Sequence, residues 1–306
     1  MKKREERRSK AIPIILTIVA AFVVLFILLP LAFSLFDGSN FGNVALIPLE
    51  GIITSNGGKM LGEVTISSAD IIQFVEEAEE NPQVKAIVLE INSPGGSAVA
   101  SDEIAAAVKK AEKPVVALIR EVGASGGYWV ASAADHIIAN RMSITGSIGV
   151  ISSYLEFSGL MEEYGVGYEQ LTAGKYKDMG VPYRKLQDEE KSIFQSKLNT
   201  IHRFFKEEIA ENRKLSEEAV EQLATGEFFL GVEAFSLGLV DELGDKTAVE
   251  EYLKTVHGLE SVDYVEYRRE VGFFELFTGV FSGFSFSMGE GFASLLLRSP
   301  NGILLT

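Results

Sequence analysis

Short apolar runs alternate with amphipathic segments over most of the chain. The runs at 44–49, 86–91 and 115–119 are rich in Val, Ile and Leu and end in polar or glycine-containing turns, so each predicts a buried strand. The segments 69–79 and 101–111 repeat apolar residues at helical spacing and predict helices. Strands that alternate with helices in this way indicate βαβ units and a largely parallel sheet.

The same alternation continues toward the C-terminus. The pattern predicts a short helix, two strands and a long amphipathic helix, in this order: 128–134, 136–139, 148–151 and 189–212. Ser216 is a typical cap for one more helix. We therefore expect one α/β domain over residues 44–255.

A long apolar segment precedes this domain. The 26 residues from Ala11 to Phe36 carry no charge, and a helix needs only roughly 20 apolar residues to cross a bilayer. A cleaved signal peptide is the alternative, but its apolar core is usually only about 7–15 residues long. We expect a retained transmembrane helix over 11–36, joined to the domain by a linker at 37–43.

The charge distribution predicts an orientation and excludes one class of partner. Residues 1–10 hold six basic and two acidic side chains, and basic flanks stay cytoplasmic. The expected location is therefore the cell membrane, with a single span, residues 1–10 in the cytoplasm and the domain outside it. The first ten residues contribute +4 to the chain's net charge of −15, which leaves −19 for the rest. A domain this acidic repels phosphate backbones, so nucleic acid is not expected as a partner.

Residues 256–306 form a C-terminal tail that departs from the pattern. Between Gly272 and Leu297 it holds seven phenylalanines, and Glu275 and Glu290 are its charged residues. Five glycines in the same stretch argue against a regular second membrane span. Packing on this domain or on a neighbouring subunit is the interpretation we favour, and an interfacial segment at the membrane is the alternative.

Two glycine turns, each at the end of a predicted strand, carry the candidate chemistry. Ser125 lies in Gly123-Ala-Ser-Gly-Gly-Tyr128, just after the run at 115–119. A serine at such a bend is held out as in a nucleophile elbow, and glycine lets a substrate backbone approach closely. The upstream turn, Asn92-Ser-Pro-Gly-Gly96, offers backbone N–H groups. A hydroxyl and free N–H groups are the parts of a serine acyl-transfer site.

A serine nucleophile needs a base, and histidine is one candidate. The chain has three histidines and no cysteine, so a cysteine nucleophile, thiolate metal ligands and disulfides are excluded. His136 reads as a core or strand-end residue, His202 as a surface residue, and His257 lies beyond the last predicted helix. None has an obvious acidic partner for a Ser-His-Asp triad.

Lysine is the other candidate, because burial can lower the pKa of its ammonium group toward neutrality. Lys175 and Lys177 would point the same way on a strand, so periodicity does not choose between them. Contact with Asp178 would favour the charged form of either lysine and so oppose the role.

Five motifs in order carry a family resemblance. They are Asn92-Ser-Pro-Gly-Gly, Gly123-Ala-Ser-Gly-Gly-Tyr, Thr145-Gly-Ser-Ile-Gly-Val, Gly174-Lys-Tyr-Lys-Asp and Leu237-Gly-Leu-Val-Asp-Glu-Leu-Gly. Over about residues 44–255 the chain resembles the signal peptide peptidase A (SppA) family of Ser-Lys peptidases, in its short, single-repeat form. The resemblance implies a fold similar to the Clp protease and crotonase folds, with stacked βαβ units, and a homo-oligomer shaped as a ring or dome.

The resemblance also implies the roles of individual residues. Ser125 would be the nucleophile, and Lys177, rather than the earlier lysine of its motif, the general base. Ser147 would orient the lysine amine. Oxyanion N–H groups would come from Gly95, Gly96 and Gly126. This chemistry needs no metal or organic cofactor, and neither glycine turn is a phosphate-binding loop.

The expected function is that of a membrane-anchored serine endopeptidase that hydrolyses signal peptides and other apolar peptides. The substrate class derives from the resemblance and the anchor. One alternative is a related membrane-bound Clp-class protease with a specific membrane-protein substrate. A crotonase-type acyl-CoA enzyme would use a carboxylate and would not need Ser125. An intact Ser125 and Lys177 argue against a third alternative, a non-catalytic membrane scaffold.

Overall fold

The computed structural model describes residues 17, 21–22, 24, 42–60 and 63–269. Among these residues, no helix is both long and apolar enough to span a membrane. The predicted anchor at 11–36 lies almost wholly outside the described residues. The same holds for most of the linker and for the Phe-rich part of the tail.

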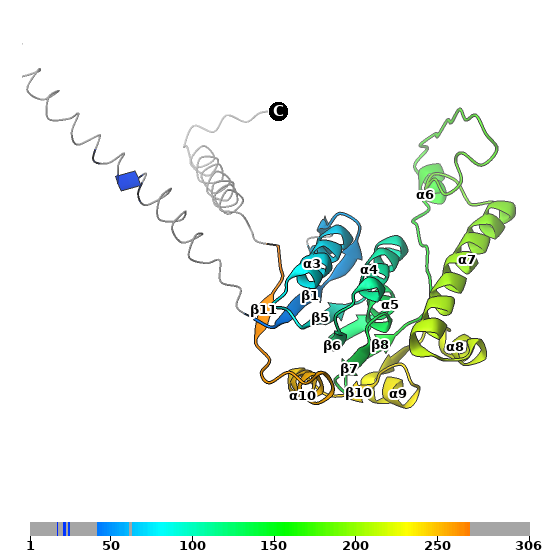
Figure 1. Ribbon diagram of the computed structural model, residues 1–306. Coiled ribbons are helices and arrows are strands. Elements are labelled where there is room, and N and C mark those ends of the chain that lie inside the picture. The colour runs from blue at the N-terminus through cyan, green and yellow to red at the C-terminus, as the bar shows by residue number, and fades with distance from the viewer. Residues whose placement is uncertain (1–16, 18–20, 23, 25–41, 61–62, 270–306) are drawn as a thin grey trace, which may run out of the picture. The chain divides into compact units, whose positions relative to one another are not determined.

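A largely parallel sheet forms the centre of the α/β domain (Figure 1). Its strands, in spatial order, are β10 (Glu242–Leu243), β7 (His136–Ala139), β6 (Val115–Ala124), β5 (Ala86–Ser93), β1 (Val44–Glu50) and β11 (Tyr264–Glu266). Neighbouring strands in this order run parallel. Helices α4 (Ala98–Lys110) and α5 (Gly126–Ser132) connect β5 to β6 and β6 to β7. The predicted α/β class, βαβ units and parallel sheet are therefore confirmed.

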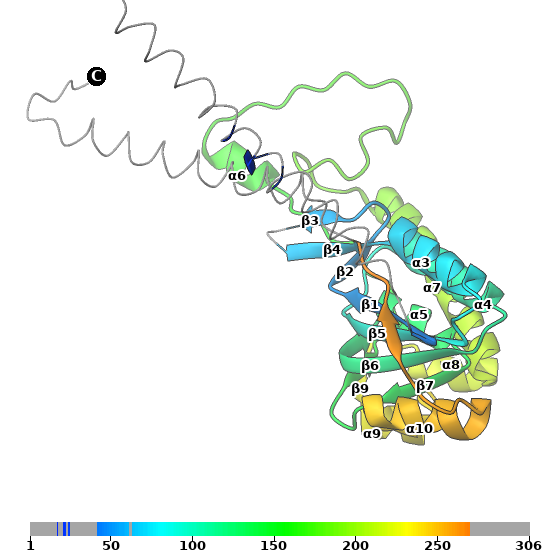
Figure 2. The same ribbon diagram turned by 60° about the vertical axis from the view of Figure 1, so that its left-hand side comes forward.

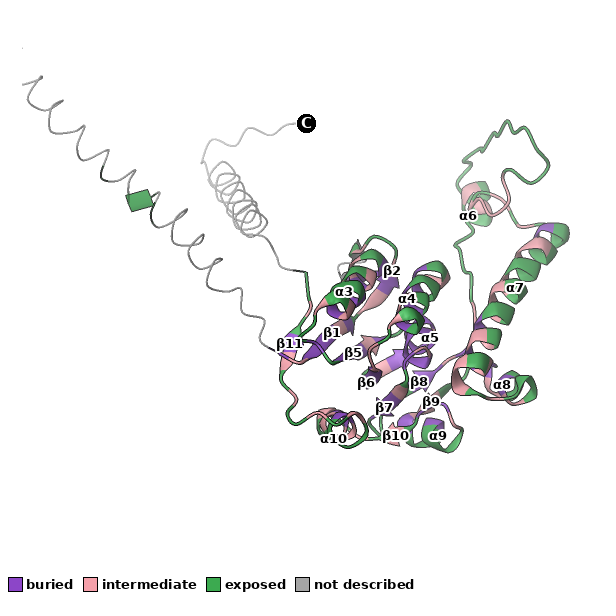
Figure 3. Ribbon diagram, in the orientation of Figure 1, coloured by how far each residue is buried: buried purple, intermediate pink, exposed green. Residues whose placement is uncertain are grey.

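The strands are apolar on both faces because both faces of the sheet are covered. Successive side chains of a strand point to opposite faces. Leu46 of β1 belongs to a core with Val249 and Leu253 of helix α10 (Lys246–His257). Its neighbour Ile47 belongs to the larger core on the other face, with residues of α3 (Ser68–Glu80), α4 and α5. Figure 3 shows these buried strands between partly exposed helices.

Helices α3, α4, α8 (Glu217–Leu223) and α10 begin where a side chain accepts a hydrogen bond from the first turn. Ser97 accepts from the Ala100 N–H at 3.4 Å, so α4 begins at Ala98, before the predicted start at residue 101. Ser216 caps α8 as predicted, by accepting from the Ala219 N–H. The remaining long helix is α7 (Asp188–Arg213), close to its predicted bounds, and α9 (Gly231–Ser236) follows α8.

A small second sheet packs against the turn that follows β5. Its strands β2 (Ile52–Thr54), β4 (Glu63–Ser67) and β3 (Gly58–Met60) were not predicted. The Ile53 N–H donates to the Gly95 carbonyl at 2.9 Å, and the Ser97 N–H donates to the Ile53 carbonyl at 2.9 Å. These two bonds attach the glycine turn to β2.

Two predicted boundaries change. The strand predicted at 148–151 is wrong. The strand in this part of the chain is β8 (Ile144–Gly146), a few residues earlier, and it pairs with the end of β6 and with β9 (Phe228–Leu230). Ile148 is buried, but the residues after it line a cavity instead of pairing with a strand. The sheet also continues past residue 255, because β11 pairs with β1 at its edge.

The 152–187 segment is built differently from the rest of the domain. It contains the short helix α6 (Ser158–Glu163) and otherwise turns and irregular backbone. None of its residues is buried. Figure 2 shows it as a long loop that extends away from the sheet before the chain returns into α7.

Candidate active site

Ser125 lies at the bend between the end of β6 and the start of α5. Its backbone has φ +51° and ψ −121°, a conformation that a non-glycine residue rarely adopts. The surroundings hold it there: the Ser125 N–H donates to the Gly146 carbonyl at 2.8 Å, and the Trp129 N–H donates to the Ser125 carbonyl at 2.9 Å. No described residue accepts a hydrogen bond from its Oγ. The geometry is that of a strained strand-to-helix turn with an unused hydroxyl.

The two glycine turns pack directly on one another. A Cβ atom on Gly95 would lie 2.6 Å from the Gly126 nitrogen, and one on Gly126 would lie 2.3 Å from Ser101 Oγ and 3.3 Å from the Gly96 nitrogen. Gly95 has φ +99°, which favours glycine. The backbones of the two turns approach so closely that no side chain fits between them.

The three glycines predicted as oxyanion donors differ in what their N–H groups do. The Gly95 N–H donates to Ser93 Oγ at 3.1 Å, so it is already used. No described residue accepts from the N–H of Gly96 or Gly126, and both residues line the same cavity as Ser125. Gly96 and Gly126 can therefore offer N–H groups to a ligand, whereas Gly95 shapes the turn.

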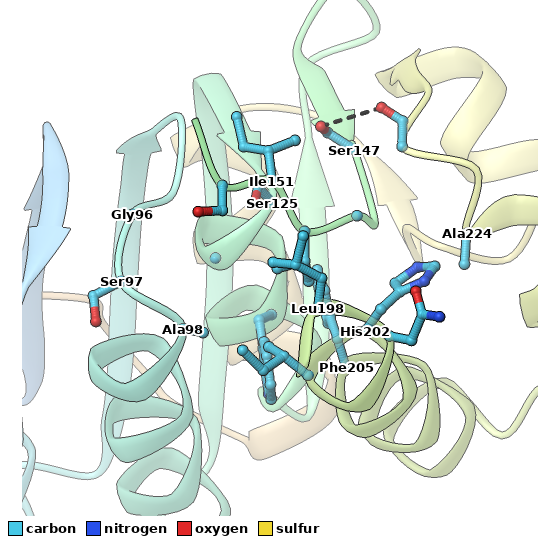
Figure 4. Close-up of a pocket in the computed structure, with 18 of the residues that line it drawn as sticks. Gly96, Ser97, Ala98, Ser125, Ser147, Ile151, Leu198, His202, Phe205 and Ala224 are labelled. Atoms are coloured by element: carbon cyan, nitrogen blue, oxygen red, sulfur yellow. Dashed lines mark hydrogen bonds between the residues drawn. The ribbon is translucent and has the colours of Figure 1, made fainter. Parts of the chain in front are cut away.

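This cavity, which we call the Ser125 cavity, has a volume of about 770 Å³. Its polar end holds Ser125, Gly96 and Ser147, and Figure 4 shows the side chains of Ser125 and Ser147 on the same side of it. Its apolar wall consists of Trp129, Leu198, Ile201, Phe205 and Ala224. The rings of Trp129 and Phe205 stack at 4.5 Å and are almost fully buried. The cavity can accept an apolar side chain next to the hydroxyl.

Ser147, predicted to orient a lysine amine, has an unusual backbone like that of Ser125. Its φ is +51°, and its N–H donates to the Glu227 carbonyl at 2.8 Å. Its Oγ makes one long hydrogen bond of 3.4 Å, to the Gly226 carbonyl (Figure 4). The hydroxyl oxygen thus remains able to accept a hydrogen bond from a group that enters the cavity.

Within one chain, Lys177 does not meet Ser125. It is exposed, lies in the turn at 175–180, and is not among the residues that line the Ser125 cavity. No strand forms here, so the two lysines of the motif are not related by strand periodicity. In Figures 1 and 2 the 152–187 segment that carries Lys177 stands away from the sheet.

The structure distinguishes Lys175 from Lys177. Lys175 Nζ forms an ion pair with Glu189 at 2.7 Å, and its hydrogen bond to that carboxylate raises the pKa of Lys175. Lys175 is therefore held in its charged form, which cannot accept a proton. Asp178 is hydrogen-bonded to Arg184 at 2.6 Å and so is not paired with either lysine.

His202 lies in the cavity, and its interpretation as a surface residue was wrong. It is half-buried, lines the Ser125 cavity, and its Nε2 is 3.3 Å from the Ile148 carbonyl (Figure 4). The signal was present in the sequence: His202 follows Leu198 by four residues and precedes Phe205 by three, which places all three on one helix face. His202 therefore lines the wall of the cavity, and no carboxylate in the described part of the chain forms a hydrogen bond with it.

The other two histidines lie elsewhere. His136 begins β7, as a strand-end residue, with its Nε2 3.3 Å from Glu242 and its ring stacked on Tyr252 at 3.9 Å. Because β6 and β7 are parallel and His136 pairs with Val116, His136 lies at the start of the strands, whereas Ser125 follows the end of β6. His257 is the last residue of α10, a helix that the pattern did not predict. Among the described residues, no cluster of His, Asp and Glu could hold a metal ion.

Comparisons with known proteins match the domain that contains this cavity. The model of peptidase family S49 matches residues 107–260, a range that contains Ser125, Ser147 and Lys177. The Clp protease family model matches residues 52–155, which include both glycine turns.

Individual relatives carry protease names. A candidate protease of Methanocaldococcus jannaschii is 36% identical over 65% of this chain and 65% of its own length. A candidate signal peptide peptidase of Enterococcus faecium is 31% identical over 78% of this chain and 70% of its own. A candidate protease of Synechocystis is 34% identical over 74% of this chain and 78% of its own. The match thus spans just under two thirds of the first relative and more of the other two.

Proposed function

Since the chain belongs to peptidase family S49, we propose that it is a serine endopeptidase with Ser125 as nucleophile and Lys177 as general base. The observation that carries the proposal is the strained turn at Ser125, whose free hydroxyl shares a cavity with the unused N–H groups of Gly96 and Gly126. Family membership supports the reaction class, and the order of the motifs supports the lysine.

In the proposed reaction, the neutral amine of Lys177 takes the proton of the Ser125 hydroxyl as Oγ attacks a peptide carbonyl. The resulting oxyanion accepts hydrogen bonds from Gly96 and Gly126, and such donors contribute about 3–4 kcal/mol each in other enzymes. The protonated lysine then donates its proton to the leaving nitrogen as the C–N bond breaks. Water, activated by the same lysine, hydrolyses the acyl-serine ester. Ser147 accepts a hydrogen bond from the lysine amine and orients it.

We propose that a second copy of the chain completes the site. The 152–187 segment exposes large apolar side chains, among them Leu155 at 72%, Tyr164 at 74% and Leu171 at 102% exposure. Such surface is rarely left in water and is typical of a contact with another protein. A homo-oligomer would cover these side chains and bring Lys177 of one copy to the cavity of another. The Clp protease-like domain supports assembly of this kind.

The proposed substrates are apolar peptides, including signal peptides that remain at the membrane. The apolar wall around Trp129 and Phe205 supports the preference for apolar side chains. The predicted anchor at 11–36, with a cytoplasmic N-terminus, supports a position at the cell membrane with the domain outside the cytoplasm. The name of the Enterococcus relative supports signal peptides as one substrate class.

The test is hydrolysis of casein and of a synthetic signal peptide by the full chain in detergent. We expect Ser125→Ala and Lys177→Ala to lower kcat/KM by at least about a thousandfold, and Lys175→Ala to keep most of the activity. Mixing the two inactive variants should restore activity, because an oligomer would combine an intact Ser125 with an intact Lys177.

Each component of the proposal can fail separately. Activity that survives Ser125→Ala would overturn the serine mechanism. Activity that survives Lys177→Ala would return attention to Lys175 and to His202 in the cavity wall. Full activity of a monomer in light scattering would exclude completion by a second copy.

A further inference from the structure

A compact ion cluster lies at the C-terminal end of the 152–187 segment. The Arg184 guanidinium donates to Asp178 through Nε at 2.6 Å and to Glu190 through Nη1 at 2.8 Å and Nη2 at 2.5 Å. The side chains are largely covered, with Asp178 18%, Arg184 26% and Glu190 3% exposed. A bidentate arginine between two carboxylates has strong directional preferences, so it fixes the relative positions of the groups it joins.

The cluster joins the Lys177 turn to a rigid helix. Asp178 directly follows Lys177, and Glu190 is in the first turn of α7, where it also accepts from the Gln187 N–H at 2.9 Å. The same helix reaches the Ser125 cavity through Phe205. Arg184 therefore ties the position of Lys177 to α7 of its own chain. In the proposed oligomer, α7 thus carries the lysine that a neighbouring copy uses.

The cluster also determines which charges are near Lys177. In the turn at 175–180 the charged neighbours of Lys177 are Lys175 and Asp178. The rest of the segment holds Glu156, Glu162, Glu163, Glu169, Arg184 and Lys185, and the first turn of α7 contributes Asp188, Glu189, Glu190 and Lys191. Lys175 pairs with Glu189, and Arg184 occupies both Asp178 and Glu190. The hydrogen bond from Arg184 holds the pKa of Asp178 below its ordinary value, so the carboxylate is ionised but engaged. Without Arg184, the Asp178 carboxylate would lose its partner directly beside Lys177, the residue that precedes it in the chain.

We propose that Arg184 is a positioning residue for Lys177: it holds the turn after the lysine against α7 and keeps the Asp178 carboxylate away from the lysine amine. This inference rests on the proposed function, in which Lys177 must be neutral to act as the base. A free carboxylate beside it would favour the charged ammonium and oppose catalysis.

The experiment measures the rate at which a fluorophosphonate probe phosphonylates Ser125, with loss of fluoride, as a function of pH, in the full chain in detergent. In wild type the rate should rise with pH, because the proposed mechanism needs a neutral base. For Arg184→Gln we expect a rate about tenfold lower and an acidic limb about half a pH unit or more higher, since the freed Asp178 stabilises the lysine cation. The double variant Arg184→Gln/Asp178→Asn should bring the limb back toward that of wild type, while the rate stays reduced.

A matched control is Arg203→Gln, in α7. Arg203 also pairs with a carboxylate, that of Glu207, but it is half-exposed and lies far along the chain from Lys177. The pH profile of this variant should coincide with that of wild type. Because Arg184→Gln leaves the buried Glu190 without a partner, Arg184→Gln/Glu190→Gln is the variant to use if the single substitution fails to fold by circular dichroism. It leaves Asp178 equally free and should show the same shift.

The outcomes separate this inference from the proposed function. If Lys177→Ala is inactive and the limb of the folded Arg184 variants coincides with that of wild type, Arg184 has only a structural role and the inference is wrong. If the probe still labels Lys177→Ala at the wild-type rate, the proposed dyad is wrong, and the inference about Arg184 is wrong as well. A shift that Asp178→Asn reverses supports both.

Discussion

The turn that carries Ser125 and the turn that carries Lys177 differ in almost every physical respect. Ser125 lies at the end of a largely buried strand, next to Gly126 and packed near Gly96, where an added Cβ atom would come within 2.3 Å of a neighbouring atom. Lys177 lies in a segment without a single buried residue, held by one ion cluster. The first turn is positioned by packing and the second by charge.

This difference separates the tasks of the proposed site. Oxyanion donors must already point at the place where charge develops, because moving them during the reaction would cost the energy that they supply. Close packing of two glycine turns provides that rigidity. A base on an exposed segment can instead arrive with a neighbouring copy, so that the nucleophile turn is complete before assembly and the dyad only after it.

The largest expected effect comes from a side chain added at Gly96, where the glycine turn after β5 packs on β2. In Gly96→Ala the new methyl group would lie 2.1 Å from the Ile53 carbonyl oxygen and must displace backbone. We expect the free energy of unfolding to fall by about 3 kcal/mol or more. Labelling of Ser125 by the fluorophosphonate probe should slow by at least about a hundredfold. Denaturant unfolding and probe labelling measure the two effects.

The matched control lies in the other region. Gly159, in α6, has no atom within 4 Å of an added Cβ and an ordinary backbone conformation. Gly159→Ala should leave the unfolding free energy unchanged or raise it by up to about 1 kcal/mol, because alanine restricts the unfolded chain. Equal effects of the two substitutions would refute the contrast between a packed turn and an open segment.

A smaller effect on activity, with a comparable loss of stability, is expected where the packed region meets the cavity. Phe205 is 2% exposed and stacks on Trp129, so Phe205→Ala should lower the unfolding free energy by about 3–5 kcal/mol. The same change enlarges the cavity at its apolar wall. It should therefore shift cleavage toward substrates with bulkier apolar side chains, which a library of peptides would measure. Unchanged residue preference in a folded variant would show that substrate side chains do not contact this wall.

The smallest effect is expected from acid, and it should reach the charge-held region first. Arg184 holds the pKa of Asp178 and Glu190 below their ordinary values of 3.8 and 4.5. Both carboxylates therefore stabilise the fold at neutral pH, and that contribution is lost as the pH falls below about 4 through their folded values. Hydrogen-exchange protection factors should drop between pH 5 and 3 at 178–191 but persist in β5 and β6. Equal loss in both regions would contradict the proposed difference.

Local patterns were sufficient for much of the fold. Apolar runs predicted β1, β5, β6 and β7, because a strand covered on both faces must be apolar throughout. Glycine and serine at strand ends predicted both turns. Apart from β4, which has five residues, the strands that the pattern missed are only two or three residues long, too short for periodicity to stand out.

The site was less accessible from the sequence. Lys175 and Lys177 have the same local context, and the Glu189 carboxylate that separates them lies on α7. His202 was interpreted from its charged neighbour Arg203, although its helix face matches that of Leu198. Arg184 carried no signal at all, because both of its partners are six residues away along the chain and meet it only through the fold.

The sequence alone determined the α/β class, the two glycine turns and the identity of the candidate nucleophile, since these depend on residue type and spacing within single elements. Only the tertiary structure decided that the Gly95 N–H is occupied while those of Gly96 and Gly126 are free, and that Lys177 lies apart from Ser125 within one chain. The reason is physical. Periodicity reports which side of an element is buried, whereas a hydrogen-bond partner or a charge neighbour depends on how distant elements pack against each other.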